Sequence, residues 1–144
     1  MPKAIRILEE LQAAFEDKPE LTRGHVSNAT LVRLMLASNQ PEEAEVVAMA
    51  LLTSVSEVET ASDFSKTLAN LSLGLAKIHN VELDEAGQNL EFVHARRALI
   101  SEFSSDELAV IKRLLEALVD QLEDLDSNTT LFDPVQWRSV LDSI

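Results

Sequence analysis

Apolar residues recur along most of this chain at the pitch of an α-helix. The clearest run extends from Leu108 to Leu125, where apolar residues follow one another at alternating spacings of three and four. This spacing places their side chains on one face of a helix. Ser104 and Glu107 precede the run with the spacing of a capping box, which satisfies free backbone N–H groups at a helix start. The pattern predicts a helix over 104–126 that packs against other helices.

The same period, with proline and acidic residues at helix starts, predicts helices along the rest of the chain. The segment 18–26, which holds Pro19 and Gly24, is expected to be the first loop. Asp133 is expected to cap the last helix, with Pro134 in its first turn and Gln136 as the capping partner. The expected helices cover about 2–17, 27–38, 41–52, 62–79, 84–103 and 104–126, with a short one from 134 onward.

The sequences of two of these helices lead to further predictions. The run Val46 to Leu52 is apolar on every side of two turns, and a helix of that kind is usually surrounded by protein. The helix over 41–52 is therefore predicted to be the central one. Gly74 lies inside the helix over 62–79, where glycine weakens a helix, so a neighbouring helix is expected to cross close to it.

Strand signals are missing, because the chain has three glycines, no tyrosine and no alternating apolar stretch between tight turns. A chain of 144 residues has the size of one domain. The predicted fold is all-α, with residues 1–144 forming a single compact domain of six or seven amphipathic helices in an orthogonal or bundle-like array.

The net charge is -13, and the segment 104–144 holds nine acids against three bases. An acidic field of this kind repels nucleic-acid phosphate and anionic lipid, so neither is expected as a direct partner. No stretch approaches the roughly 18 unbroken apolar residues of a membrane-spanning helix. Cysteine is absent, which fits a reducing compartment, and the first ten residues lack a signal-peptide core, so we expect a soluble cytoplasmic protein.

Three short patterns resemble metal sites without completing one. Glu91 and His94 have the spacing of one half-site of a helical di-iron centre, but no second copy exists. Residues 124–135 resemble an EF-hand calcium loop, yet Thr129 replaces its glycine and Val135 its bidentate glutamate. The acids Glu42 and Glu45 resemble the magnesium pair of helical nucleotide pyrophosphohydrolases, whose second pair has no good counterpart here. No metal ligand, catalytic residue or cofactor is therefore predicted.

Two other groups of polar residues are candidates for binding a partner. Glu123, Asp124 and Asp126 crowd the end of their helix, where the negative end of the dipole disfavours acids and a basic partner would relieve them. Asn89 and Arg96 interrupt an apolar helix face. Arg96 is expected to cover apolar surface with its stem or to pair with an acid, and the alternative is that both residues face a pocket or a second subunit.

The second half of the chain resembles the proximal half of a globin. The resemblance rests on a succession of apolar residues around one histidine, followed by the long helix over 104–126, and it implies a haem-binding fold with His79 as the iron ligand. Apart from the globin resemblance, His79 is expected at the end of a helix whose dipole favours its cationic form. The residues concerned are Leu71, Leu75, His79, Val81, Leu83, Phe92, Leu99 and Phe103.

The function predicted from these patterns is that of a non-enzymatic protein–protein interaction protein, an adaptor, regulator or immunity-type inhibitor. It would act through its acidic helical surface on a partner with a basic surface, with a homodimer as a further option. Two alternatives remain open at this point. One is a globin-like or other helical sensor of a small molecule or haem, and the other is an acidic mimic of DNA that inhibits a nucleic-acid-binding protein.

Overall fold

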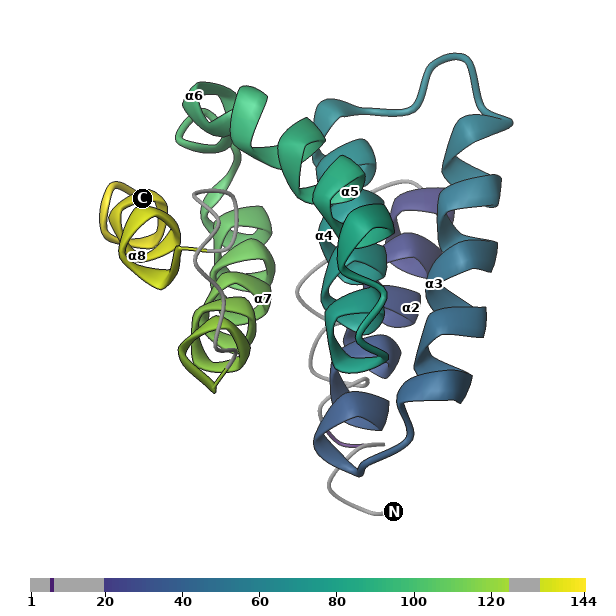
Figure 1. Ribbon diagram of the computed structural model, residues 1–144. Coiled ribbons are helices and arrows are strands. Elements are labelled where there is room, and N and C mark those ends of the chain that lie inside the picture. The colour runs from purple at the N-terminus through teal and green to yellow at the C-terminus, as the bar shows by residue number, and fades with distance from the viewer. Residues whose placement is uncertain (1–5, 7–19, 125–132) are drawn as a thin grey trace.

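The computed structural model describes residue 6, residues 20–124 and residues 133–144 (Figure 1). These residues form helices and contain no strand, which confirms the all-α fold. The predicted helix over 2–17 lies outside the described residues. The helices are α2 (Glu20–Ala37), α3 (Pro41–Ser56), α4 (Asp63–His79), α5 (Leu83–Ala95), α6 (Arg97–Ile100), α7 (Ser105–Asp124) and α8 (Pro134–Asp142).

The central helix is α4, which packs against α2, α3, α5 and α7. Every residue from Phe64 to Ile78 except Lys66 and Lys77 is buried. The prediction that the helix over 41–52 is central is wrong, because Val46 is 68% exposed on α3. The order of the helices explains the difference, because α3 lies at the edge and packs mainly against α2 and α4, whereas four helices surround α4.

Helix α2 begins at Glu20, seven residues before the predicted start, so the expected loop over 18–26 is helical from residue 20 onward. Gly24 therefore lies within a helix, at a cost of about 1 kcal/mol relative to alanine. Burial of His25 and Val26, which are 3% and 1% exposed, favours the longer helix.

The predicted helix over 84–103 is two helices, because Arg96 leaves helical geometry at φ -107° and ψ 15°. Its Nη1 donates to the carbonyl oxygen of Phe92 at 3.3 Å, and its guanidinium carbon lies 3.6 Å from the centre of the Phe92 ring. Nη1 of Arg97 donates to the carbonyl oxygen of His94 at 2.8 Å. Two arginine side chains thus satisfy carbonyl groups that the end of α5 leaves free.

Three predicted helix starts are confirmed. Oγ of Ser62 accepts a hydrogen bond from the N–H of Ser65 at the start of α4. Ser104 and Glu107 form the reciprocal capping box before α7, at 3.0 and 3.3 Å. Asp133 caps α8 through the N–H of Val135 at 2.9 Å.

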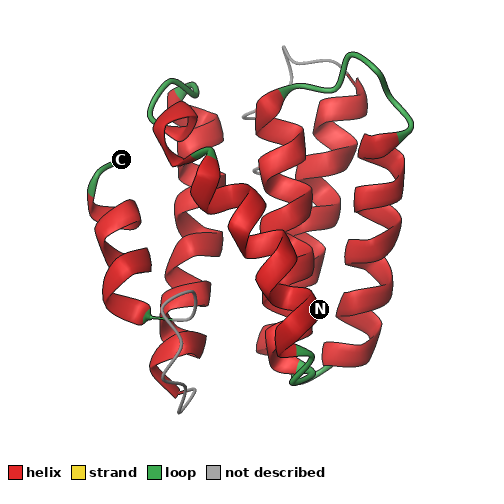
Figure 2. Ribbon diagram, turned by 45° about the horizontal axis from the view of Figure 1, so that its top comes forward, coloured by secondary structure: helices red, strands yellow, loops and turns green. Residues whose placement is uncertain are grey.

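The described helices share one hydrophobic core, with α8 at one side and α3 at the opposite side (Figures 1 and 2). Helix α8 packs on α7 and is joined to α5 by a contact between the rings of Trp137 and His94, whose centres are 5.6 Å apart. Gln136, predicted to complete the cap of α8, instead places its side-chain amide 3.0 Å from Nε2 of His94. No helix in the described ranges is long and apolar enough to cross a membrane.

Candidate functional site

A groove of about 630 Å³ opens between α2, the end of α4 and the second half of α7. We call it the helix-end groove. Its floor is apolar and is formed by Leu36, Leu75 and Ala117, whereas its walls are charged. The other lining residues are Arg33, Ala37, His79, Arg113, Glu116, Asp120, Gln121 and Asp124.

The groove takes its character from helix ends. Ala37 and His79 are the last residues of α2 and α4, Asp124 is the last described residue of α7, and all three line it. Each helix end carries the negative pole of the helix dipole, about half an elementary charge. The ends of α2 and α4 converge on one opening, where Asp120 and Asp124 of α7 add full negative charges. This part of the groove attracts cationic groups.

The C-terminal ends of α2 and α4 close with the same six-residue hydrogen-bond pattern. At the end of α2, the N–H of Gln40 donates to the carbonyl of Met35, with Asn39 at φ 59° between them. At the end of α4, the N–H of Glu82 donates to the carbonyl of Lys77, with Val81 at φ 60°. This is the Schellman motif, which stops a helix abruptly and fixes where its dipole ends.

The opposite part of the groove is positive. Arg33 of α2 and Arg113 of α7 both line it, and burial, followed by repulsion from Arg113, lowers the pKa of Arg33, while Glu116 opposes that shift. Within the described part of the chain, neither guanidinium lies within 4.0 Å of a carboxylate oxygen. Along α7, Arg113 and Asp124 are separated by about 16 Å at 1.5 Å per residue. The groove is therefore positive toward one end and negative toward the other.

His79 is half-buried in this groove, and burial lowers the pKa of its imidazole. Burial therefore opposes the stabilisation of the cationic form that was predicted from the helix dipole, and that prediction stays a prediction. Leu75 lies one turn before His79, as the globin resemblance implies, but two arginines and three carboxylates also line the groove. Haem sites need broad apolar walls, so these residues do not fit a haem.

Asn89 and Arg96 are not part of the groove, and the structure does not bring them together. Asn89 is 9% exposed and donates from Nδ2 to Oδ1 of Asn70 at 3.0 Å. Arg96 places its guanidinium over the Phe92 ring, and the expectation that its stem covers apolar surface stays a prediction. Arg96 forms no ion pair with an acid among the described residues, and the alternative of a pocket or second subunit also stays a prediction.

The three acids predicted at the end of α7 have different surroundings. Glu123 pairs with Arg138 of α8, so a base within the chain already relieves it. Asp124 is exposed and lines the groove. Asp126 lies outside the described residues, as does most of the segment that resembles a calcium loop.

The described residues hold no group of three or more histidine, aspartate or glutamate side chains that could bind a metal ion. His94, which together with Glu91 has the spacing of a di-iron half-site, contacts Gln136 and Arg97. The acid Glu45 accepts a hydrogen bond at 3.0 Å from Nδ2 of Asn80.

Comparisons with models of protein families, with curated proteins and with solved structures find no match for this chain.

Proposed function

We propose that this protein is a non-enzymatic interaction protein whose helix-end groove binds a basic segment of a partner protein. The main support is the convergence of two helix C-terminal ends, those of α2 and α4, with Asp120 and Asp124 of α7 on one open groove. The apolar floor supports the proposal, because the aliphatic stem of a lysine or arginine packs on such a floor while its charge reaches the carboxylates. The absence of cysteine favours a reducing compartment, and we place this activity in the cytoplasm.

The test compares a neutralised groove with an equal charge change elsewhere. Asp120→Asn with Asp124→Asn removes two negative charges from the groove and keeps the side-chain size. Glu91→Gln with Glu102→Gln removes two exposed charges from α5 and the loop before α7. Binding of a fluorescent oligolysine peptide is measured by anisotropy at increasing sodium chloride.

The groove variant is expected to lose most of the binding, and the control variant to lose little. Binding should also weaken as salt rises, since exposed charges are screened over about 8 Å at physiological ionic strength. Equal losses in the two variants would show that the peptide responds only to the net charge of -13, and the groove proposal would then be wrong.

A second candidate function is the binding of a small carboxylate ligand, favoured by the guanidiniums of Arg33 and Arg113 at the positive end, which form no ion pair within the described ranges. Arginine holds carboxylates through two parallel hydrogen bonds. Arg33→Gln with Arg113→Gln distinguishes the two functions. If the second function is correct, this double variant loses the rise in melting temperature that a carboxylate ligand causes. If the first function is correct, the variant binds oligolysine more strongly.

A further inference from the structure

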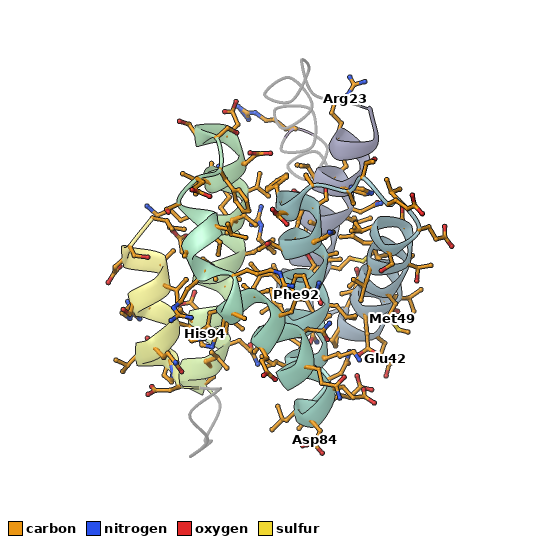
Figure 3. All side chains as sticks on the ribbon, turned by 90° about the horizontal axis from the view of Figure 1, so that it is seen from above. Arg23, Glu42, Met49, Asp84, Phe92 and His94 are labelled. Carbon is orange, nitrogen blue, oxygen red and sulfur yellow. The ribbon has the colours of Figure 1, made fainter. Side chains whose placement is uncertain are left out.

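The outward face of α3 is apolar and exposed. Val46 and Met49 are 68% and 51% exposed, and Ala50 and Thr53 beside them are exposed as well. These four residues occupy positions i, i+3, i+4 and i+7, which form one stripe along a helix. The opposite face of α3 is buried through Ala44, Ala48, Leu51 and Val55. Figure 3 shows Met49 at the side of the molecule away from α8.

An outward face of this composition is unusual for a helix at the edge of a domain. Surface helices normally present charged residues to solvent, and a helix apolar on all sides is normally surrounded. The run from Val46 to Leu52 is apolar on all sides, yet the described chain covers one side only. Methionine in such a stripe is typical of binding surfaces, because its flexible side chain adapts to the shape of a partner.

Both ends of the stripe carry only negative charge. Glu42 and Glu43 are exposed in the first turn of α3, and Glu57 is exposed directly after its last turn. The whole segment 41–65 contains no lysine, arginine or histidine. Its acids are Glu42, Glu43, Glu45, Glu57, Glu59 and Asp63.

Acids are also crowded beside the start of α3. A hydrogen bond with the Glu45 carboxyl is the main cause that raises the pKa of Glu82, with burial and repulsion from Glu45 and Glu85 adding to it. The base in this region, Lys77, is paired with Glu85 at 3.3 Å. Exposed acids of α3 and of the residue after it therefore flank the apolar stripe at both of its ends.

We infer that the outward face of α3 is a second docking surface, which takes an amphipathic helix of a partner protein with an apolar stripe and basic residues at both ends. Glu42 and Glu57 are about 22 Å apart along the helix axis at 1.5 Å per residue. A partner helix of about four turns, with lysine or arginine in its first and last turns, matches this spacing. The surface lies on a different helix from those that line the helix-end groove, so the inference goes beyond the function proposed for that groove.

Charge complementarity decides between this partner and a second copy of the chain. In a parallel pairing of two α3 helices, Glu42 and Glu43 of one copy face the same acids of the other. In an antiparallel pairing they face Glu57. Like charges meet in either case, which disfavours self-association through this surface.

The experiment uses the full chain and two synthetic helical peptides. Both peptides carry leucine at i, i+3, i+4 and i+7, and one has lysines and the other glutamates at its ends. Val46→Glu and Met49→Glu place a charge in the stripe, at exposed positions where the fold is not expected to change. Val135→Glu is the matched control, since Val135 is a similarly exposed helical valine, 72% exposed, on α8.

The lysine peptide is expected to bind the unmodified chain and the Val135→Glu variant alike, and about tenfold more weakly to Val46→Glu and Met49→Glu. Glu42→Gln with Glu57→Gln should also weaken it, in a salt-dependent way. Asp120→Asn with Asp124→Asn should leave it unchanged, which separates this surface from the groove. Circular dichroism and the melting temperature establish that each variant is folded.

Three results would overturn the inference. The first is equal binding of the lysine peptide to the chain and to Met49→Glu, or no binding to either. The second is equal binding of the lysine and glutamate peptides. The third is a dimer of the unmodified chain in sedimentation analysis that Val46→Glu converts to monomer, because the occupant would then be a second copy.

Discussion

The side chains of Asn89 and Asn70 join α5 to α4 in the interior through a hydrogen bond of 3.0 Å, in which Nδ2 of Asn89 donates to Oδ1 of Asn70. Nδ2 of Asn70 in turn donates to the carbonyl oxygen of Lys66 at 2.9 Å. Both asparagines are 9% exposed. Buried amides are tolerated when their donors and acceptors find partners, and this pair orients two helices that otherwise meet through apolar contacts.

Asn89→Ala is expected to lower the free energy of unfolding by about 1–2 kcal/mol, because Oδ1 of Asn70 loses its donor in a buried place. The double variant Asn70→Ala, Asn89→Ala should lose less than the sum of the single variants. Denaturant unfolding measures all three. Asn28→Ala is the control, since Asn28 is exposed on α2, and its effect should stay within about 0.5 kcal/mol. Strictly additive losses would contradict the coupling.

Gly74 lies where α5 crosses α4, as predicted from its place inside a helix. A Cβ atom at this position would be 3.0 Å from Cδ2 of Leu90 and 3.4 Å from Cβ of Asn89. Leu90 is fully buried, so it has little room to move. Gly74→Ala is therefore expected to destabilise the protein by about 1 kcal/mol, because overpacking outweighs the gain in helix propensity.

Gly24→Ala is the matched control for this prediction. Gly24 also lies inside a helix, but a Cβ atom there would meet nothing within 4 Å. Only the propensity gain remains, so this variant should be more stable by about 0.5–1 kcal/mol. Chemical denaturation distinguishes the two, and a stabilising Gly74→Ala would show that the crossing is looser than the structure indicates.

The helix starts were predictable from the sequence because capping is local. The pairs that cap α4, α7 and α8 lie within three residues of one another, and a short stretch of sequence contains both partners. The close crossing at Gly74 was predictable for a similar reason, since glycine in a long helix needs a compensating contact. The break at Arg96 was missed, because two adjacent arginines that bond the carbonyls of the preceding turn do not interrupt the helical spacing of the apolar residues.

The central position of α4 was not predictable from hydrophobicity. Helix α3 is the more apolar of the two, yet burial on all sides depends on where the rest of the chain places its helices, and four of them pack around α4. Only part of the helix-end groove could be predicted from the sequence. Asp124 was recognised from its place at a helix end, whereas Arg33 and Asp120 reach the same groove from distant parts of the sequence, and only the packing of the helices brings them together.

Val81 adopts a left-handed backbone, φ 60°, directly after α4 and is 71% exposed. A β-branched residue is strained in this region, by about 1–2 kcal/mol, and glycine is the usual residue at this position of a Schellman motif. Val81→Gly is expected to raise the free energy of unfolding by about 1 kcal/mol. Asn39 occupies the equivalent place after α2, and since asparagine tolerates this backbone, Asn39→Gly should change stability by only a few tenths of a kcal/mol. Thermal unfolding tests both, and equal effects would contradict the strain at Val81.

His25 is a buried histidine of α2 whose Nδ1 lies 3.1 Å from Oγ of Ser65 on α4. The residue is 3% exposed, and its Nε2 is buried with no hydrogen-bond partner in the part of the chain that the structure describes. Burial lowers the pKa of the imidazole below its usual 6.5. Below pH 6.5 the unfolded chain therefore binds a proton more readily than the folded protein does, so the stability due to neutral His25 is complete above that pH and is lost as the pH falls.

His25→Asn removes this titration and keeps a polar group near Ser65. The variant is expected to be less stable than the unmodified protein at pH 7.5, because packing is lost, and the difference should shrink as the pH falls toward 5. His79 and His94 also have pKa values lowered by burial, so part of the slope persists in the variant. Urea unfolding at half-unit pH steps measures both curves. Parallel curves across this range would show that His25 takes up its proton equally in the folded and unfolded states, and that its burial does not set the acid sensitivity of the fold.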